Sequence, residues 1–205
     1  MNRFPYVLTG ILMIVGGALL ALGGRAENDP SEEYERESGM TSGDENVRAE
    51  KATFAAGCFW GVEETFRNID GVISTSVGYT GGRTDDPSYK EVCSDETGHA
   101  EAVEVVFDPE KVKYEDLLTV FWEAHDPTTL NYQGPDFGTQ YRSAVFYHSP
   151  EQQATAEKSK ADLAKSGKFK RPIVTEITEA SSYFMAEDYH QQYLAKRGLG
   201  SCRTN

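Results

Sequence analysis

Apolar and polar positions repeat with two different periods from residue 51 onward. Residues 100–107 (AEAVEVVF) alternate at every second position, which is the period of a strand. Residues 114–125 carry large apolar side chains at helical spacing. With turn and capping residues taken as boundaries, the pattern predicts a strand at 51–56, a helix at 60–69, strands at 71–79 and 100–107, a helix at 114–125, a strand at 141–148, a helix at 150–166, a strand at 173–177 and a helix at 186–197.

The order of these elements predicts the fold class. Strand–helix–strand units repeated in this way give an α/β (α+β) two-layer sandwich of the ferredoxin-like type. Residues 198–205 contain two glycines and little that can pack, so we expect a mobile C-terminal tail. Residues 51–205 are long enough to form one domain with its own core.

A different pattern precedes this domain. Residues 4–24 carry no charge, and an arginine stands on either side of them at Arg3 and Arg25. A short basic start and an apolar run are typical of a secretory signal, and about 20 apolar residues also suffice to cross a bilayer. Residues 1–26 are therefore predicted to be a signal peptide or an N-terminal membrane anchor. Either one predicts an exported protein, which is periplasmic or extracytoplasmic, secreted or membrane-anchored.

The charge of the chain changes sharply after the apolar run. Residues 27–50 hold nine acidic and two basic residues, with almost nothing apolar, and we interpret them as a disordered acidic linker. Of the net charge of −13, about −8 belongs to residues 51–205. A mildly acidic domain argues against a nucleic-acid partner, because binding phosphates requires a basic face. We expect a monomer.

The chain contains three cysteines, Cys58, Cys93 and Cys202. An exported protein held by disulfides normally has an even number, and no pair here has the spacing of a structural zinc site. The count therefore favours redox chemistry. Cys58 lies in GCFWG, where the strand at 51–56 turns into the helix at 60–69. Unpaired amides and the helix dipole at such a turn stabilise an anion, which predicts a lowered thiol pKa and a nucleophilic thiolate.

The sequence offers several other candidate groups that can act together with this thiol. Phe59 and Trp60 leave the start of one helix in different directions, so a pocket wall is an alternative to ordinary core packing. Glu101 lies on an alternating strand: facing inward it is a protonated acid, and facing outward it is an ordinary surface carboxylate. Tyr89 and Tyr141 are phenols that can share proton donation with Glu101. His99 is interpreted as structural.

Seven short motifs follow one another between residues 51 and 202. They are GCFWG at 57–61, GYTGG at 78–82, YKEVCS at 89–94, TGHAEAVEV at 97–105, FWEAHDPTT at 121–129, GTQYRSAVF at 138–146 and AEDYHQQYL at 186–194. In this order they resemble the A-type peptide methionine sulfoxide reductases. The resemblance implies reduction of the S epimer of methionine sulfoxide, free or in proteins, without a prosthetic cofactor.

The same resemblance implies a role for each candidate group. Cys58 is the nucleophile on the sulfoxide sulfur, and Glu101 gives a proton to the sulfoxide oxygen. Tyr89 and Tyr141 hydrogen-bond that oxygen. The remaining site residues hold the methyl group or orient the site: Phe59, Trp60 and Asp136.

Recycling of the thiol is also implied by the resemblance. The sulfenic acid on Cys58 is converted to a disulfide by Cys202, which matches the resolving position of the family. Such relatives often have a second tail cysteine, and none follows Cys202 here, so we expect a single disulfide opened by a thioredoxin-like or other dithiol reductant. Cys93 is interpreted as a bystander. Outside the cytosol that reductant is a membrane-relayed or secreted thioredoxin-like protein.

Two other functions compete with this interpretation. Cys58 paired with a histidine gives a thiol protease, in which loss of the histidine abolishes activity and Cys202 is irrelevant. A non-catalytic module that binds methionine sulfoxide or peptides predicts binding without turnover by dithiothreitol.

Overall fold

The computed structural model describes residues 48–200, and everything below concerns that part of the chain. The predicted leader at 1–26, nearly all of the acidic linker at 27–50 and Cys202 lie outside the described residues. Within the described part, no helix is long and apolar enough to cross a membrane.

Four antiparallel strands form the centre of the domain. They are β1 (Glu50–Ala56), β2 (Val72–Thr80), β3 (Ala100–Phe107) and β6 (Ser143–Tyr147), in the spatial order β6–β1–β3–β2. Helix α2 (Phe59–Arg67) connects β1 to β2, and α4 (Tyr114–Ala124) connects β3 to β6. A strand–helix–strand unit split by an intervening antiparallel strand is the ferredoxin-like arrangement, so the predicted fold class is confirmed.

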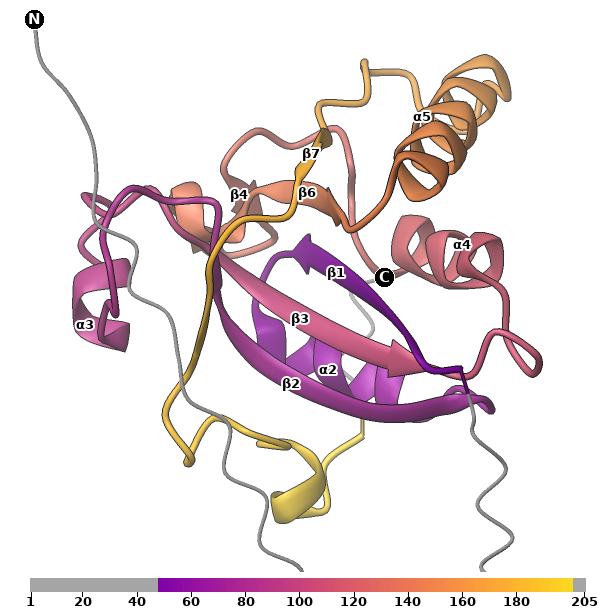
Figure 1. Cartoon of the computed structure of the whole chain (residues 1–205). Coiled ribbons are helices and arrows are strands. Elements are labelled where there is room, and N and C mark those ends of the chain that lie inside the picture. Colours follow the sequence, from indigo (N-terminus) through magenta and orange to yellow (C-terminus); the bar gives the residue numbers. More distant parts are fainter. Residues whose placement is uncertain (1–47, 201–205) are drawn as a thin grey trace, which may run out of the picture. The chain divides into compact units, whose positions relative to one another are not determined.

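Two further strands extend this sheet to six. Strand β7 (Glu176–Glu179) lies parallel to β6 after the crossover through helix α5 (Pro150–Lys165). Strand β8 (Tyr183–Met185) pairs antiparallel with β2 at the opposite edge. Figure 1 shows α2 against the face of β2 and β3. Helices α4 and α5 contact each other, and they pack against β1 and β6 respectively.

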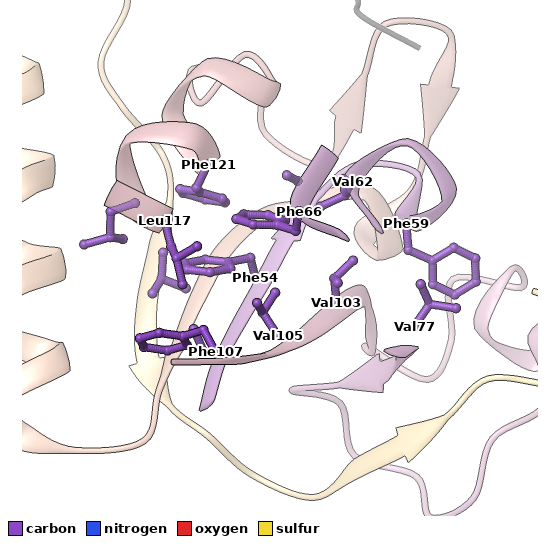
Figure 2. Close-up of a cluster of buried hydrophobic side chains, with 14 of the residues drawn as sticks. Phe54, Phe59, Val62, Phe66, Val77, Val103, Val105, Phe107, Leu117 and Phe121 are labelled. Carbon is purple, nitrogen blue, oxygen red and sulfur yellow. The ribbon is translucent and has the colours of Figure 1, made fainter. Parts of the chain in front are cut away.

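The main core lies between the sheet and the helices α2 and α4. Phe54 of β1 stacks on Phe66 of α2 at 4.9 Å and on Phe121 of α4 at 5.3 Å between ring centroids (Figure 2). Side chains of β3 alternate between the two faces of the sheet, and Val103 and Val105 enter this core. Glu101 shares their face, because it lies two residues before Val103. The opposite face carries mostly small residues.

The predicted helix at 186–197 is wrong. This segment consists of turns and ends in a 3-10 helix, η2 (Ala195–Arg197). Its side chains bond to other elements instead of lining a helix: Glu187 accepts from the Tyr89 amide, and Gln191 bonds both backbone groups of Val77. Those tertiary bonds outweigh the local helical pattern.

The strand predicted at 173–177 is displaced to β7. The Val174 amide donates to the Pro127 carbonyl at 2.9 Å, so the first part of that stretch is tied to a loop rather than to the sheet. Several short elements are present that the sequence pattern did not predict: α3 (Tyr89–Val92), the hairpin of β4 (Tyr132–Gln133) and β5 (Asp136–Phe137), the 3-10 helix η1 (Thr139–Tyr141), and β8.

Candidate active site

Cys58 occupies the position that caps the start of α2, directly after β1. The chain reaches it through Gly57, whose φ of +91° is a conformation that side-chain-bearing residues rarely adopt. A β-carbon on Gly57 would lie 2.7 Å from Cγ of Gln133, so the site also needs glycine for space. The backbone amides of Trp60 and Gly61, in the first turn of α2, favour the charged form of the Cys58 sulfur.

The structure corrects the expectation of a lowered thiol pKa. Burial of Cys58 and, after it, the charge of Glu101 raise the pKa of the thiol to about 12. The amides of the first helical turn lower the pKa, but by less than burial raises it. In the free protein at neutral pH, Cys58 is therefore a thiol rather than a thiolate.

Glu101 is the acidic partner of this thiol. It is 2 % exposed on β3, and its Oε2 accepts a 3.0 Å hydrogen bond from the amide of Phe59, the residue after Cys58. Burial raises the pKa of Glu101 to about 8, with a smaller contribution from the charge of Asp136. The carboxyl is thus mostly protonated at neutral pH, as an acid catalyst requires.

Two phenols lie within the influence of the Glu101 charge. Burial first and Glu101 second raise the pKa of Tyr141, which ends η1. Burial and a hydrogen bond with the thiol of Cys93 raise the pKa of Tyr89, which begins α3. Both phenols therefore keep their protons at neutral pH and remain hydrogen-bond donors. Cys93 itself is exposed and lies beside this cluster.

A cavity of about 270 Å³ opens beside Cys58, and its lining is mainly apolar. Trp60 and Asp136 are among the lining residues, whereas Phe59 and Glu101 are not. Phe59 is 1 % exposed and packs against Tyr79 and His190, so its place is in the core rather than on this wall. The residues that complete the lining are Ala56, Gly61, Val62, Thr65, Ala124, His125, Gln133, Pro135 and Leu194.

A thiol beside a protonated carboxyl and an apolar cavity is suited to reducing an oxidised thioether. The family model described as peptide methionine sulfoxide reductase matches residues 50–205. The chain belongs to the A-type peptide methionine sulfoxide reductase family.

Individual relatives agree with this assignment. The peptide methionine sulfoxide reductase MsrA of Methanoculleus marisnigri is 61 % identical over 155 residues, which cover 76 % of this chain and 94 % of that protein. The MsrA of Geobacter metallireducens is 60 % identical over 159 residues, covering 78 % and 98 %. The crystal structure of reduced Mxr1 from Saccharomyces cerevisiae has a TM-score of 0.71 and 37 % identity over 76 % of this chain and 90 % of that one.

Family membership identifies the chain as an oxidoreductase that reduces methionine S-sulfoxide. The thiol protease alternative is therefore not needed, and the geometry also opposes it. His125 lines the cavity, but its two ring nitrogens already bond the Phe121 carbonyl at 2.8 Å and the Ser143 hydroxyl at 2.7 Å. Burial lowers the pKa of His125 to about 4. Residues 48–200 also contain no group of three or more potential ligands placed to hold a metal ion.

Three residues of the C-terminal segment, residues 186–200, contact Trp60 or line the cavity, although none of them was predicted as a site residue. The Trp60 indole donates to Nδ1 of His190 at 3.0 Å and stacks on Tyr193 with ring centroids 3.6 Å apart. Leu194 lines the cavity. His190, Tyr193 and Leu194 all belong to the motif AEDYHQQYL. Because a helix was predicted for this motif, the sequence did not indicate which of its side chains lie near Trp60.

Proposed function

We propose that this chain reduces methionine S-sulfoxide in oxidised exported proteins, with Cys58 as nucleophile, Glu101 as acid and Cys202 as the resolving thiol. The observation that carries the proposal is the bond between the Phe59 amide and Glu101, because it holds a protonated carboxyl against the residue that follows Cys58. A sulfoxide is a poor electrophile until its oxygen is protonated, so the thiol needs an acid opposite it.

The first half of the reaction balances with these groups alone. The sulfur of Cys58 attacks the sulfoxide sulfur while Glu101 gives its proton to the sulfoxide oxygen, and the thiol proton restores Glu101. The attack forms a sulfur–sulfur bond. The hydroxyl then passes from the substrate sulfur to the sulfur of Cys58 as that bond breaks, so methionine leaves and Cys58 carries the oxygen as a sulfenic acid. Tyr89 and Tyr141 donate hydrogen bonds to the oxygen.

Binding of the substrate uses the residues around the thiol. In the proposal Trp60 holds the methyl group on the cavity wall, Phe59 supports the site from the core, and Asp136 orients the site from the cavity rim. Trp60 is suited to this because one face stacks on Tyr193 and its indole nitrogen is bonded to His190, which leaves the ring rigid.

The second half needs Cys202. Its thiol attacks the sulfenic sulfur of Cys58, so a disulfide forms and water leaves. The described chain supports this reach: the Leu199 amide donates to the Leu194 carbonyl at 3.0 Å, and Leu194 lines the cavity beside Cys58. Cys202 is three positions after Leu199 in the sequence, which allows about 10 Å of extended chain. The tail is proposed to move for this step.

A thioredoxin-like dithiol is proposed to open the disulfide. The crystal structure of Mxr1 from Saccharomyces cerevisiae in complex with Trx2 shares the fold of this chain, with 24 % identity and a TM-score of 0.51. The partner in that complex belongs to the yeast protein, and we propose the same type of partner for this chain. Because residues 4–24 predict export, the donor here is proposed to be extracytoplasmic, either membrane-relayed or secreted.

One set of assays tests the chemistry. Wild type, Cys58→Ser and Cys202→Ser are given peptides that carry the S or the R sulfoxide, with thioredoxin or dithiothreitol as reductant. We expect Cys58→Ser to be inactive, Cys202→Ser to form one methionine per protein but not to cycle with thioredoxin, and the R epimer to be inert. Turnover by Cys58→Ser, preference for R, or normal cycling of Cys202→Ser contradicts the proposal.

Location and assembly are tested separately. The full chain and a variant without residues 1–26 are tagged and followed by cell fractionation, and we expect only the full chain to leave the cytoplasm. An intact leader in the membrane fraction identifies an anchor, and a shortened soluble product identifies a cleaved signal. The protein is proposed to be a monomer, which sedimentation of residues 51–205 checks.

A further inference from the structure

Glu63 is a buried carboxyl that the reaction does not use. It lies on α2, five residues after Cys58, and is 1 % exposed. A buried carboxyl is costly unless hydrogen bonds or a counter-ion compensate for the lost water. Among the described residues its cationic neighbour Arg67 pairs with Glu64 instead, at 3.2 Å. Glu63 is therefore held by hydrogen bonds rather than by an ion pair.

Its two oxygens join the helix to two other parts of the chain. Oε2 accepts a 2.7 Å hydrogen bond from the backbone amide of Gln192, and Oε1 accepts a 3.1 Å bond from the hydroxyl of Thr75 on β2. The first of these links residues that are 129 positions apart. The shorter bond thus fixes the C-terminal segment, residues 186–200, to the helix that carries Cys58 at its start.

Gln192 is itself unusual. Its φ of +53° is left-handed, a conformation that costs an L-residue about 1 kcal/mol or more and persists only where the surroundings enforce it. The amide bonded to Glu63 belongs to this residue, so the buried carboxyl and the unfavourable backbone conformation meet at one hydrogen bond. This coincidence suggests that the turn at Gln192 has a task beyond packing.

The position of the turn indicates the task. Gln191, just before it, bonds the edge-facing backbone of Val77, and Tyr193, just after it, stacks on Trp60. Beyond Gln192 no side chain of another element is seen to bond the backbone of the described segment. Within the described residues, the bond to Glu63 is thus the last such anchor on the way to Cys202.

We propose that Glu63 is a positioning residue for the C-terminal segment: its carboxyl holds the turn at Gln192 and thereby directs the chain that carries Cys202 toward Cys58. This role rests on the proposed Cys58–Cys202 disulfide. It predicts that Glu63 acts on resolution of the sulfenic acid and leaves the reduction of sulfoxide to Cys58 and Glu101.

Three variants separate this role from packing. Glu63→Met keeps the length of the side chain and removes both acceptors. Glu63→Gln keeps both bonds, because its oxygen accepts from Gln192 and its amide donates to the Thr75 hydroxyl. Thr75→Val removes only the other bond of Glu63 and leaves the link to Gln192, so it is the matched control. Glu63→Asp, with a carboxyl one carbon shorter, replaces Glu63→Met if that variant does not fold.

The variants are compared by three measurements on the full chain. Hydrogen exchange followed by mass spectrometry reports the protection of residues 186–200 in the reduced protein. Rapid mixing with an excess of S-sulfoxide peptide and no reductant gives the rate of methionine formation, and counting free thiols by alkylation gives the rate of disulfide formation.

For Glu63→Met we expect faster exchange of residues 186–200 and disulfide formation slowed about fivefold or more, the factor expected for loss of one buried hydrogen bond. Methionine formation stays at the wild-type rate. Glu63→Gln and Thr75→Val are expected to match wild type in all three measurements. Equal slowing in Thr75→Val, or wild-type disulfide formation in Glu63→Met, overturns the proposal. Cys202→Ser is run in parallel: normal cycling there contradicts the proposed disulfide, whereas the exchange measurement still tests the anchor by itself.

Discussion

The backbone amide of Phe59 donates a 3.0 Å hydrogen bond to Oε2 of Glu101, 42 residues farther along the chain. Phe59 starts α2 directly after Cys58, and Glu101 lies on the central strand β3. The bond therefore fixes the acid relative to the thiol before any substrate arrives. Because the amide binds one carboxyl oxygen, the other is left to carry the proton that Glu101 is proposed to give to the sulfoxide oxygen.

The first prediction concerns the acid itself. Glu101→Gln removes the ionisable proton but keeps an oxygen that accepts from Phe59, so the fold is expected to be retained. We expect the single-turnover rate of methionine formation from an S-sulfoxide peptide to fall about 10²- to 10⁴-fold, the usual contribution of a positioned acid. Alkylation of Cys58 and thermal unfolding are the controls. A variant that keeps the wild-type rate shows that the proton comes from elsewhere.

The second prediction is the pH dependence of that step. The proposed mechanism requires the protonated carboxyl, and burial raises the pKa of Glu101 to about 8. The rate of methionine formation is therefore expected to be flat below pH 8 and to decline above it. The residual rate of Glu101→Gln lacks that decline. Rapid-quench measurements between pH 6 and pH 10, on the order of half a unit apart, check this; a rate that rises steadily through this range contradicts it.

The third prediction links the same pKa to stability. The folded pKa of Glu101, about 8, lies above the ordinary value of 4.5, so folding favours the protonated form. Its contribution to the free energy of unfolding is complete below the unfolded pKa and is lost as the pH rises through about 8. The free energies of unfolding of wild type and Glu101→Gln are compared by urea unfolding at pH values from 4.5, the ordinary pKa, to above the folded pKa of about 8. We expect the free energy of unfolding of wild type, relative to that of the variant, to decrease as the pH rises. If this difference does not change with pH, the raised pKa of Glu101 is contradicted.

The fourth prediction separates the two aromatic residues after Cys58. Phe59 is fully buried against Tyr79, whereas Trp60 is half-buried and lines the cavity. Phe59→Ala is expected to lower the free energy of unfolding by about 3–5 kcal/mol, the range for deleting a buried ring. Trp60→Ala is expected to cost less stability and to raise KM for sulfoxide peptides. Urea unfolding and initial rates distinguish them, and a Phe59→Ala protein of wild-type stability contradicts the assignment.

Alternation along residues 100–107 was enough to predict β3 and to place Glu101 on the same face as Val103 and Val105. Whether that face was buried depended on partners that are distant in the sequence. Strand β3 lies between β1 and β2, and α2 covers it, so the inward alternative is the observed one. A period in one strand specifies which residues share a face, and only the other elements determine which face is covered.

The thiol pKa shows the opposite limit. The start of a helix is a local feature, and the amides of the first turn of α2 do lower the pKa of Cys58, as predicted. Burial and the carboxyl of Glu101 are non-local, and they outweigh those bonds. The helix predicted at 186–197 was wrong for the same reason, because non-local contacts outweigh the local pattern. Glu187 and Gln191 bond to Tyr89 and Val77, and the helical spacing of this segment gives no sign of those bonds.

The last prediction concerns the glycine that precedes Cys58. Gly57→Ala adds a β-carbon at a φ of +91° and 2.7 Å from Gln133, a cavity residue. The strained backbone costs about 1–2 kcal/mol, and the clash displaces Gln133 or shifts Cys58. We therefore expect lower stability together with slower methionine formation. The matched control is Gly134→Ala, next to Gln133 in the hairpin of β4 and β5. At Gly134 φ is +54° and nothing lies within 4 Å of the added carbon. That variant is expected to lose stability and keep its rate; equal rates for the two variants show that space at Gly57 does not matter for catalysis.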